Sequence, residues 1–355
     1  MADDKIHIVT EAATRILADL ADPQTINHAD NDAWKEPLWQ ALSTAGLPLA
    51  WVPERLGGSG ATLTDGFAIL SVAGRFALAA PLAETLIAGW LLARGDLAAP
   101  KTRMTIAPVR PRDRIVIDAD GKLNGRATGV PFAGESEHIA VLATDGQQQH
   151  IALVETGRCR LGESRNLAGD PANVVTFERV MPIRTAPAPR GFDQTSLMLI
   201  GSIVRSVETA GALETILSLS VAYANERVAF ERRIGKFQAV QQNLARLAGE
   251  TAAAVAIAGS AVDAAAQTEI FDEGMFLEAA SAKIRSAEAA AEGAAIAHQV
   301  FGAIGFTQEH ILHRFTLRLL SWRDDFGSES YWAAELGKLV ARRGADDFWP
   351  LVASR

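Results

Sequence analysis

The spacing of apolar positions divides the chain into three stretches. In the first, apolar residues such as Ile8, Ile16 and Leu20 recur at helical spacing, and this pattern stops at Asp22-Pro23, because a proline disfavours the helical conformation in the residue before it. The same period predicts further helices over 32–42, 63–76 and 81–94. Residues 1–104 are therefore predicted to form a helical domain.

The second stretch, residues 105–189, changes to short runs of alternating or β-branched residues. Asp120-Gly121 and Asp145-Gly146 separate several of these runs, and Asp-Gly between apolar runs favours a hairpin. Prolines at 182, 187 and 189 then indicate a linker. This stretch is predicted to be a small antiparallel β domain of about six strands.

The third stretch, residues 190–355, is alanine-rich and helical in period. Helices are expected over 194–232, 237–268, 274–301, 310–324 and 328–343. Small residues at the contacts suit a close-packed bundle, and residues 251–261 are apolar on most sides, as at a bundle centre or a subunit interface. The fold class is therefore α+β, with helices before and after a central β domain.

Composition and charge exclude several classes of function. The chain has 355 residues, with 34 Lys+Arg against 42 Asp+Glu and a net charge of −8, which argues against nucleic acid as a partner. A single cysteine, Cys159, excludes an internal disulfide and a cysteine-based zinc site. Neither a signal peptide nor a membrane span is visible in the sequence, so a cytoplasmic location is expected.

Few local motifs indicate chemistry without ambiguity, since neither a Walker A pattern nor GxGxxG is present. The glycine-rich segment 57–60 could cradle an anion, but a tight turn between helices is the favoured interpretation. His310 and His313, with Glu309 beside them, have a spacing that could ligate a metal, although surface histidines are the simpler interpretation.

Two charged groups are stronger candidates. Asp324 and Asp325 follow a predicted helix, where paired carboxylates could perform acid–base catalysis or simply be solvated. A basic turn surrounds Phe230 and contains Arg227, Arg232, Arg233 and Lys236. Guanidinium groups bind phosphate oxygens in bidentate fashion, so this turn either clamps a phosphate or is a charged helix end, and the residues alone favour neither.

Several of these stretches together resemble the acyl-CoA dehydrogenase flavoprotein family. The segment Tyr223–Phe230 and its continuation Ile234–Gln241 carry the family's arginine, a phenylalanine three residues later, and an I-x-x-F-Q pattern. A second block, Gln299–Thr307, and the early loop Leu49–Gly60 also match. The resemblance covers nearly the whole chain.

The resemblance implies a helical domain, a β domain and a C-terminal four-helix bundle, assembled as a homodimer, a homotetramer or a complex with a related subunit. It implies FAD between the β domain and the bundle, and an acyl-CoA substrate that undergoes α,β-dehydrogenation. Arg227 would meet the FAD pyrophosphate of a partner subunit. The residues implied around the same cofactor are Phe230, Ile234, Gln238, Gln299 and Gly302.

The chain also departs from the family pattern. Where the family's base is a Glu followed by Gly, this chain has Phe326 before Gly327, and where a subgroup takes its base from the preceding helix, it has Gly201. The T-E-P-x-x-G-S-D and W-I-T-N segments that contact the flavin ring are missing. Asp325 or Asp324 is the expected base if this chain supplies one, and Glu208 is another nearby acid.

These departures leave several hypotheses. The main one is a divergent acyl-CoA dehydrogenase subunit, active in fatty acid or steroid degradation, that binds FAD at an interface and works with a related partner. The alternatives are a self-sufficient homomer that uses Asp324 or Asp325, and a non-catalytic or flavin-free structural subunit. A monooxygenase or nitroalkane oxidase-like activity is a further alternative on the same fold.

Overall fold

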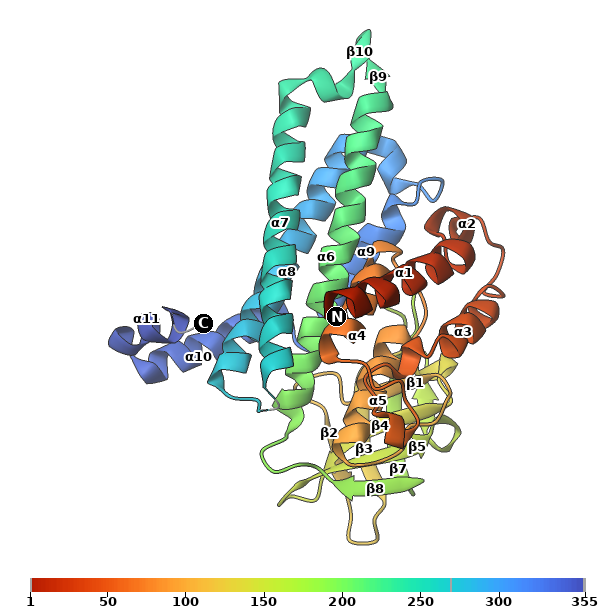
Figure 1. The fold of residues 1–355 in the computed structure, drawn as a ribbon, viewed down its shortest axis with the longest axis vertical. Helices are drawn as coiled ribbons and strands as arrows, with labels where there is room; N and C mark the ends of the chain where they lie inside the picture. The colour runs from red at the N-terminus through yellow and green to blue at the C-terminus, as the bar shows by residue number, and fades with distance from the viewer. Residues whose placement is uncertain (1, 269, 354–355) are drawn as a thin grey trace.

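The computed structural model describes residues 2–268 and 270–353, and it has the predicted order of helices, strands and helices. Figure 1 shows the sheet at one end of the molecule and the long helices α6, α7 and α8 running away from it. The N-terminal helices lie along one side of both parts. The three-part layout expected from the sequence is therefore confirmed.

The N-terminal part is helical, as its apolar period predicts. Its elements are α1 (Ala2–Leu20), α2 (Pro23–Asn27), α3 (Lys35–Thr44), η1 (Leu47–Leu49), η2 (Glu54–Leu56), α4 (Leu63–Arg75) and α5 (Leu82–Arg94). Asp22 ends the first pattern by capping α2, because its side chain accepts a hydrogen bond from the backbone N–H of Thr25. Thr62 and Asp65 form a capping box that begins α4.

The central part is an eight-stranded sheet within the described residues. Its elements are β1 (Met104–Ala107), β2 (Arg114–Ile117), β3 (Leu123–Pro131), η3 (Ala133–Glu135), β4 (His138–Thr144), β5 (Gln149–Glu155), η4 (Thr156–Arg158), β6 (Arg160–Gly162), β7 (Ala172–Val180) and β8 (Arg184–Pro187). The prediction of a purely antiparallel domain is corrected, because β1 and β2 both pair with β4 in parallel. Those pairings join segments distant in sequence, and hairpin signals between adjacent strands do not report them.

The C-terminal part is the helical bundle. Its elements are α6 (Gln194–Glu226), β9 (Val228–Ala229), β10 (Arg232–Arg233), η5 (Ile234–Lys236), α7 (Gln238–Gln267), α8 (Glu273–Phe301), η6 (Gly302–Phe306), α9 (Leu312–Trp322), α10 (Glu329–Arg343) and α11 (Ala345–Ala353). The helix expected to continue to Arg232 ends at Glu226 instead, and a short β9–β10 hairpin follows it. The sequence also did not predict α11, which contains Pro350.

The helix α6 is the centre of the molecule, and glycines let its neighbour α4 approach it closely. A Cβ atom at Gly211 of α6 would lie 2.2 Å from the carbonyl oxygen of Ser71, and one at Gly74 of α4 would lie 2.2 Å from the carbonyl oxygen of Glu208. Any larger side chain would push the N-terminal domain off the bundle. This contact holds the two helical parts in a fixed relation.

Two helices, α6 and α7, are long and apolar enough to cross a membrane by length and composition. The apolar window of α6 is 100% buried inside the protein, as in the core helix of a globular bundle. That of α7 is 28% buried, so the segment around 251–261 packs on the bundle with one face and leaves small residues on the other.

We expect Gly211→Ala to destabilise the protein by about 1–3 kcal/mol, because the added methyl group collides with the backbone of α4. Urea unfolding followed by circular dichroism would measure this change. Gly337→Ala in α10 is the matched control, since nothing lies within 4 Å of its Cβ position and alanine is the better helix former. Equal stability of the two variants would contradict the packing argument.

Candidate active site and cofactor-binding tip

The two positions at which the family carries a base meet in this structure, and an aromatic contact occupies them. Phe326 follows α9 and is fully buried, while Gly201 lies on α6. A Cβ atom at Gly201 would lie 2.1 Å from Cδ1 of Phe326, so the ring rests directly on the helix backbone. The two residues that the resemblance aligns with base positions therefore lie in one contact, and neither is an acid.

The backbone at Phe326 is held in an unusual conformation. Its φ is +55°, a left-handed value that bulky side chains rarely adopt. The carbonyl oxygen accepts hydrogen bonds from Ser202 Oγ at 3.2 Å and from Trp332 Nε1 at 3.0 Å. These two bonds fix the loop between α9 and α10 and direct the ring inward.

A buried ionic cluster lies one helical turn along α6 from Gly201. The guanidinium of Arg205, which is 4% exposed, contacts Glu84 at 2.6 Å, Glu208 at 2.6 Å and Asp325 at 3.1 Å. Arg110, after β1, lies 3.7 Å from Asp325. Removing one member of such a cluster would leave the other charges buried and unpaired.

Burial shifts the protonation of the cluster. It raises the pKa of Glu208 to about 7, in opposition to Arg205 and with the aid of the negative charge on Glu84. Burial also raises the pKa of Glu84. Lys283 of α8 is buried nearby and donates to the carbonyl oxygen of Trp322, and burial lowers its pKa to about 7.

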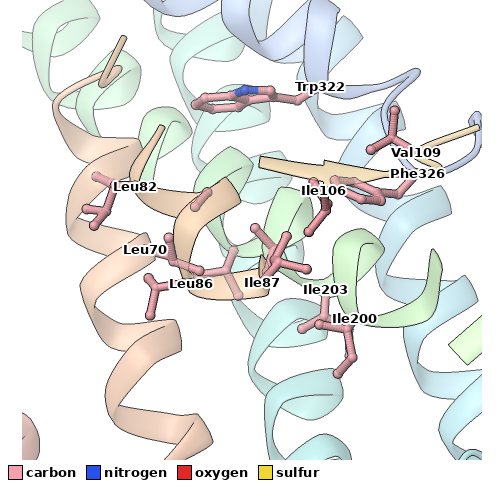
Figure 2. Close-up of a cluster of buried hydrophobic side chains, with 14 of the residues drawn as sticks. Leu70, Leu82, Leu86, Ile87, Ile106, Val109, Ile200, Ile203, Trp322 and Phe326 are labelled. Carbon is pink, nitrogen blue, oxygen red and sulfur yellow. The ribbon is translucent and has the colours of Figure 1, made fainter. Parts of the chain in front are cut away.

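The junction between the sheet and the bundle is nearly filled. Figure 2 shows Phe326 in one buried cluster with Ile106, Val109, Ile200 and Ile203. The cavity beside Arg205, Glu208 and Asp325 has a volume of about 20 Å³. A space of that size holds about one water molecule, whereas pockets for larger ligands have about 300–1,000 Å³. This cavity is smaller than the flavin ring that the family resemblance implies.

Asp324 and Asp325 lie at this junction but differ in environment. Asp325 is half-buried and bound to Arg205, so its lone pairs are engaged in the ionic cluster. The side chain of Asp324 is exposed, and its backbone carbonyl accepts from Arg110. Neither carboxylate faces a cavity large enough for an acyl thioester, and their role as a base stays a prediction.

The basic turn predicted around Phe230 forms the tip of the bundle, far from the sheet (Figure 1). Phe230 and Glu231 connect β9 to β10 and have φ values of +52° and +64°. The ring of Phe230 is 89% exposed. A large aromatic side chain on a left-handed turn is strained and poorly solvated, which is typical of a contact made with another molecule.

The tip also brings the two family motifs together. Tyr223 of α6 stacks on Phe301 of α8, with ring centroids 4.4 Å apart. Arg227, Gln238, Gln299 and Gly302 are exposed around this contact, while Ile234 is half-buried. Arg227 makes no side-chain hydrogen bond or ion pair within the described part of the chain. Their contact with the adenosine pyrophosphate end of FAD, which the family resemblance implies, stays a prediction.

The tip and the junction of one chain are far apart. Arg205 lies within α6, and Arg227 is the C-cap residue of the same helix, 22 positions later. The rise of an α-helix over this length places their Cα atoms about 33 Å apart. The tip therefore lies too far from its own junction to share a cofactor ring with it. A cofactor gripped by this tip must have its ring in another chain.

The other sequence candidates have local structural roles. The backbone N–H groups of segment 57–60 all donate to loop carbonyls, and a Cβ atom at Gly58 would lie 2.1 Å from the carbonyl oxygen of Val52. This segment is a packed turn. His313 Nδ1 donates to the carbonyl oxygen of His310 at 2.8 Å. Among the described residues, no group of three or more potential ligands could hold a metal ion.

Comparison with known proteins gives the class to which this arrangement belongs. Residues 191–329 match the family model described as acyl-CoA dehydrogenase, C-terminal domain. The three-part fold and the two motifs at the bundle tip agree with this match. Residues 191–329 therefore match the C-terminal domain of acyl-CoA dehydrogenases, and the chain as a whole is similar to members of that family.

Individual relatives cover most of the chain. Acyl-CoA dehydrogenase IpdE2 of Mycobacterium tuberculosis is 28% identical over 314 residues, 88% of this chain and 89% of that protein. A chain of the ChsE4-ChsE5 complex of Mycobacterium tuberculosis has the same fold, with a TM-score of 0.83, 22% identity and coverage of 96% and 98%. A chain of the Tcur3481-Tcur3483 steroid enzyme has a TM-score of 0.84, 24% identity and coverage of 96% and 99%.

Sequence reasoning missed most of the ionic cluster. Glu208 was noted only as a nearby acid, and Arg205, Glu84 and Lys283 were not singled out. The available signal was the placement of Arg205 and Glu208, three residues apart, within an otherwise apolar part of α6. Charges at such positions are buried only when they are paired.

Glu208 predicts a pH dependence of stability. Because its folded pKa of about 7 exceeds the ordinary value of 4.5, its contribution is complete below pH 4.5 and is lost as the pH rises through 7. Lys283 has the opposite effect on stability. Because its folded pKa of about 7 lies below the ordinary value of 10.5, its titration makes the protein more stable as the pH rises from 7 to 10.5. We expect the melting temperature to fall from pH 5 to 7 more steeply in the wild type than in Glu208→Gln.

Differential scanning calorimetry at several pH values would measure this slope. Glu309→Gln is the matched control, because Glu309 is exposed and the variant should keep the wild-type slope. The same slope in Glu208→Gln and wild type would show that Glu208 does not titrate in this range.

Proposed function

We propose that this chain is one subunit of a heteromeric FAD-dependent acyl-CoA dehydrogenase, in which a related partner subunit holds the flavin ring, the acyl thioester and the catalytic base. This chain contributes the tip formed by Arg227, Phe230 and the end of α8. The complex carries out α,β-dehydrogenation of an acyl-CoA thioester. Two relatives of this fold are complexes of two differently named chains, which supports a heteromer here.

The observation that carries this proposal is the packing of Phe326 on Gly201. Neither residue at the two expected base positions is an acid, and the ring of Phe326 fills the space between them. The cavity that remains at the junction has a volume of about 20 Å³. The ionic cluster around Arg205 closes the remaining space. A chain with this junction requires another chain for the chemical step, although its tip retains the features of a working subunit.

The tip would bind the cofactor through charge and shape. The guanidinium of Arg227 can donate in bidentate fashion to pyrophosphate oxygens, and Phe230 can pack against the adenine ring. Gly302 has φ +63° and open space at its Cβ position, which leaves room for close backbone approach to the ligand. FAD, when bound, accepts the β-hydrogen of the substrate as a hydride. The fatty acid or steroid nature of the substrate stays a prediction.

The visible spectrum of the purified protein tests this proposal. We expect the chain alone to be colourless even after incubation with FAD, because its junction cannot take the flavin ring. Co-expression with an acyl-CoA dehydrogenase-like chain encoded beside it should give a yellow complex. Flavin absorbance and full dehydrogenase turnover by the unpaired chain would contradict the proposal, and a colourless co-purified complex would favour the flavin-free structural subunit.

Within the complex, Arg227→Gln should weaken FAD binding about tenfold or more, since a charge-assisted hydrogen bond to the pyrophosphate is lost. Titration of the apo complex with FAD, followed by fluorescence, would measure the affinity. Arg246→Gln on α7 is the matched control, because Arg246 is exposed and pairs only with Glu292 on the bundle surface. Unchanged FAD affinity in Arg227→Gln would show that Arg227 does not bind the cofactor.

The self-sufficient hypothesis makes a different prediction about Asp324 and Asp325. If the partner supplies the base, Asp324→Asn and Asp325→Asn should each leave substrate-dependent bleaching of the flavin within a few-fold of wild type. Stopped-flow absorbance of the assembled complex would measure this rate. A loss of about 100-fold or more with FAD retained and assembly intact would assign the base to this chain.

A further inference from the structure

A polar cavity beside the junction, to which Asp170 connects it, contains more arginine side chains than its acids pair with. It has a volume of about 380 Å³ and lies where three parts of the chain meet. One wall is the segment from α2 to the start of α3, another is the turn between β6 and β7, and the third is α9. This volume is near the lower end of pockets that hold small molecules.

Arg318 of α9 is the most buried cation of this cavity, with 3% of its surface exposed. Its Nη2 donates to Asp170 at 2.6 Å, and Nη1 donates to the carbonyl oxygen of Arg314. Its Nε is buried and has no hydrogen-bond partner. A buried guanidinium donor without a partner is costly.

Arg314 lies one turn before Arg318 on the same helix and is half-buried. Its guanidinium makes no hydrogen bond or ion pair within the described residues, and its Nε is also buried. Burial and the charge of Arg318 lower the pKa of Arg314 to about 10. Two like charges at this spacing repel each other unless an anion lies between them.

The charges of Asp170 and Asp32 act on Arg314 and oppose the lowering of its pKa, but the acids around the cavity form their ion pairs with other cations. Glu135 and Asp32 are both bound by Lys35, at 2.8 Å and 3.0 Å. Asp170 is already paired with Arg318, and Asp30 lies exposed at the rim. On the opposite wall Arg165 donates only to the carbonyl oxygen of Gly169. Arg165 and Arg314 are thus cations without an ion-pair partner within the described residues.

We propose that this cavity binds the phosphate group of a small molecule between Arg314, Arg318 and Arg165. A tetrahedral dianion has enough oxygens to accept from guanidinium groups on two opposite walls, whereas a planar carboxylate is satisfied by a single fork. The site adjoins the junction through Asp170 but uses none of the residues assigned to FAD, so it does not depend on the function proposed above.

Thermal unfolding and calorimetric titration with inorganic phosphate and inorganic diphosphate test this site. At matched ionic strength in chloride, phosphate or diphosphate should raise the melting temperature of the wild type. Arg314→Gln should bind these anions about tenfold or more weakly and, without ligand, should be as stable as wild type, because it removes an unpaired charge. Arg165→Gln, at an exposed position, should weaken binding without affecting folding.

Arg246→Gln is the control and should bind as the wild type does. The proposal is overturned if phosphate and diphosphate act no differently from chloride, or if Arg314→Gln and Arg165→Gln retain wild-type affinity. Acetate binding as tight as that of phosphate would overturn the assignment to phosphate. None of these measurements involves FAD or dehydrogenation, so failure here leaves the proposed function unaffected.

Discussion

The contact between Phe326 and the backbone of Gly201 determines what the rest of this structure can do. It is possible only because residue 201 lacks a side chain and residue 326 has a left-handed backbone, held by Ser202 and Trp332. The ring then takes the space between the sheet and the bundle. The other groups at the junction, including the ionic cluster around Arg205, pack around this buried ring.

The ionic cluster explains why a closed junction is stable. One guanidinium among three ionised carboxylates would leave excess negative charge, but Arg110 offsets part of it and the raised pKa values of Glu84 and Glu208 reduce the rest. The cluster also joins parts that are distant in sequence, since Glu84 comes from α5, Arg205 and Glu208 from α6, and Asp325 from the loop before α10. It therefore connects the N-terminal helices to the bundle by charge, beside the glycine-mediated contact between α4 and α6.

Much of the architecture was predictable because it depends on local signals. The apolar period located α4, α5, α7 and α8 to within a residue or two, and two motifs with defined spacing identified the family. The parallel pairing of β1 and β2 with β4 was not predictable, since it joins distant segments. The hairpin after Glu226 was missed because Val228 to Arg233 fits a helical period as well as a strand, and only tertiary structure decides between them.

The candidate site was predictable in part. The family resemblance implied Arg227, Phe230 and Gly302 as cofactor-binding residues; the structure has them exposed at one tip of the bundle, and their cofactor role stays a prediction. The absence of an acid at residues 201 and 326 was visible in the sequence, but the contact between these residues was not. The partners of Arg205 could not be predicted, because burial of a charge depends on which helices pack against it.

The separation of tip and junction has a consequence for the partner chain of the proposed heteromer. In a symmetric pair, each tip serves the neighbour's centre, and both are under the same functional constraint. Here the neighbour's tip would face a centre already occupied by Phe326 and would have nothing to hold. Its arginine could then be replaced without loss of function, so the two genes would be expected to diverge at opposite ends of the same fold.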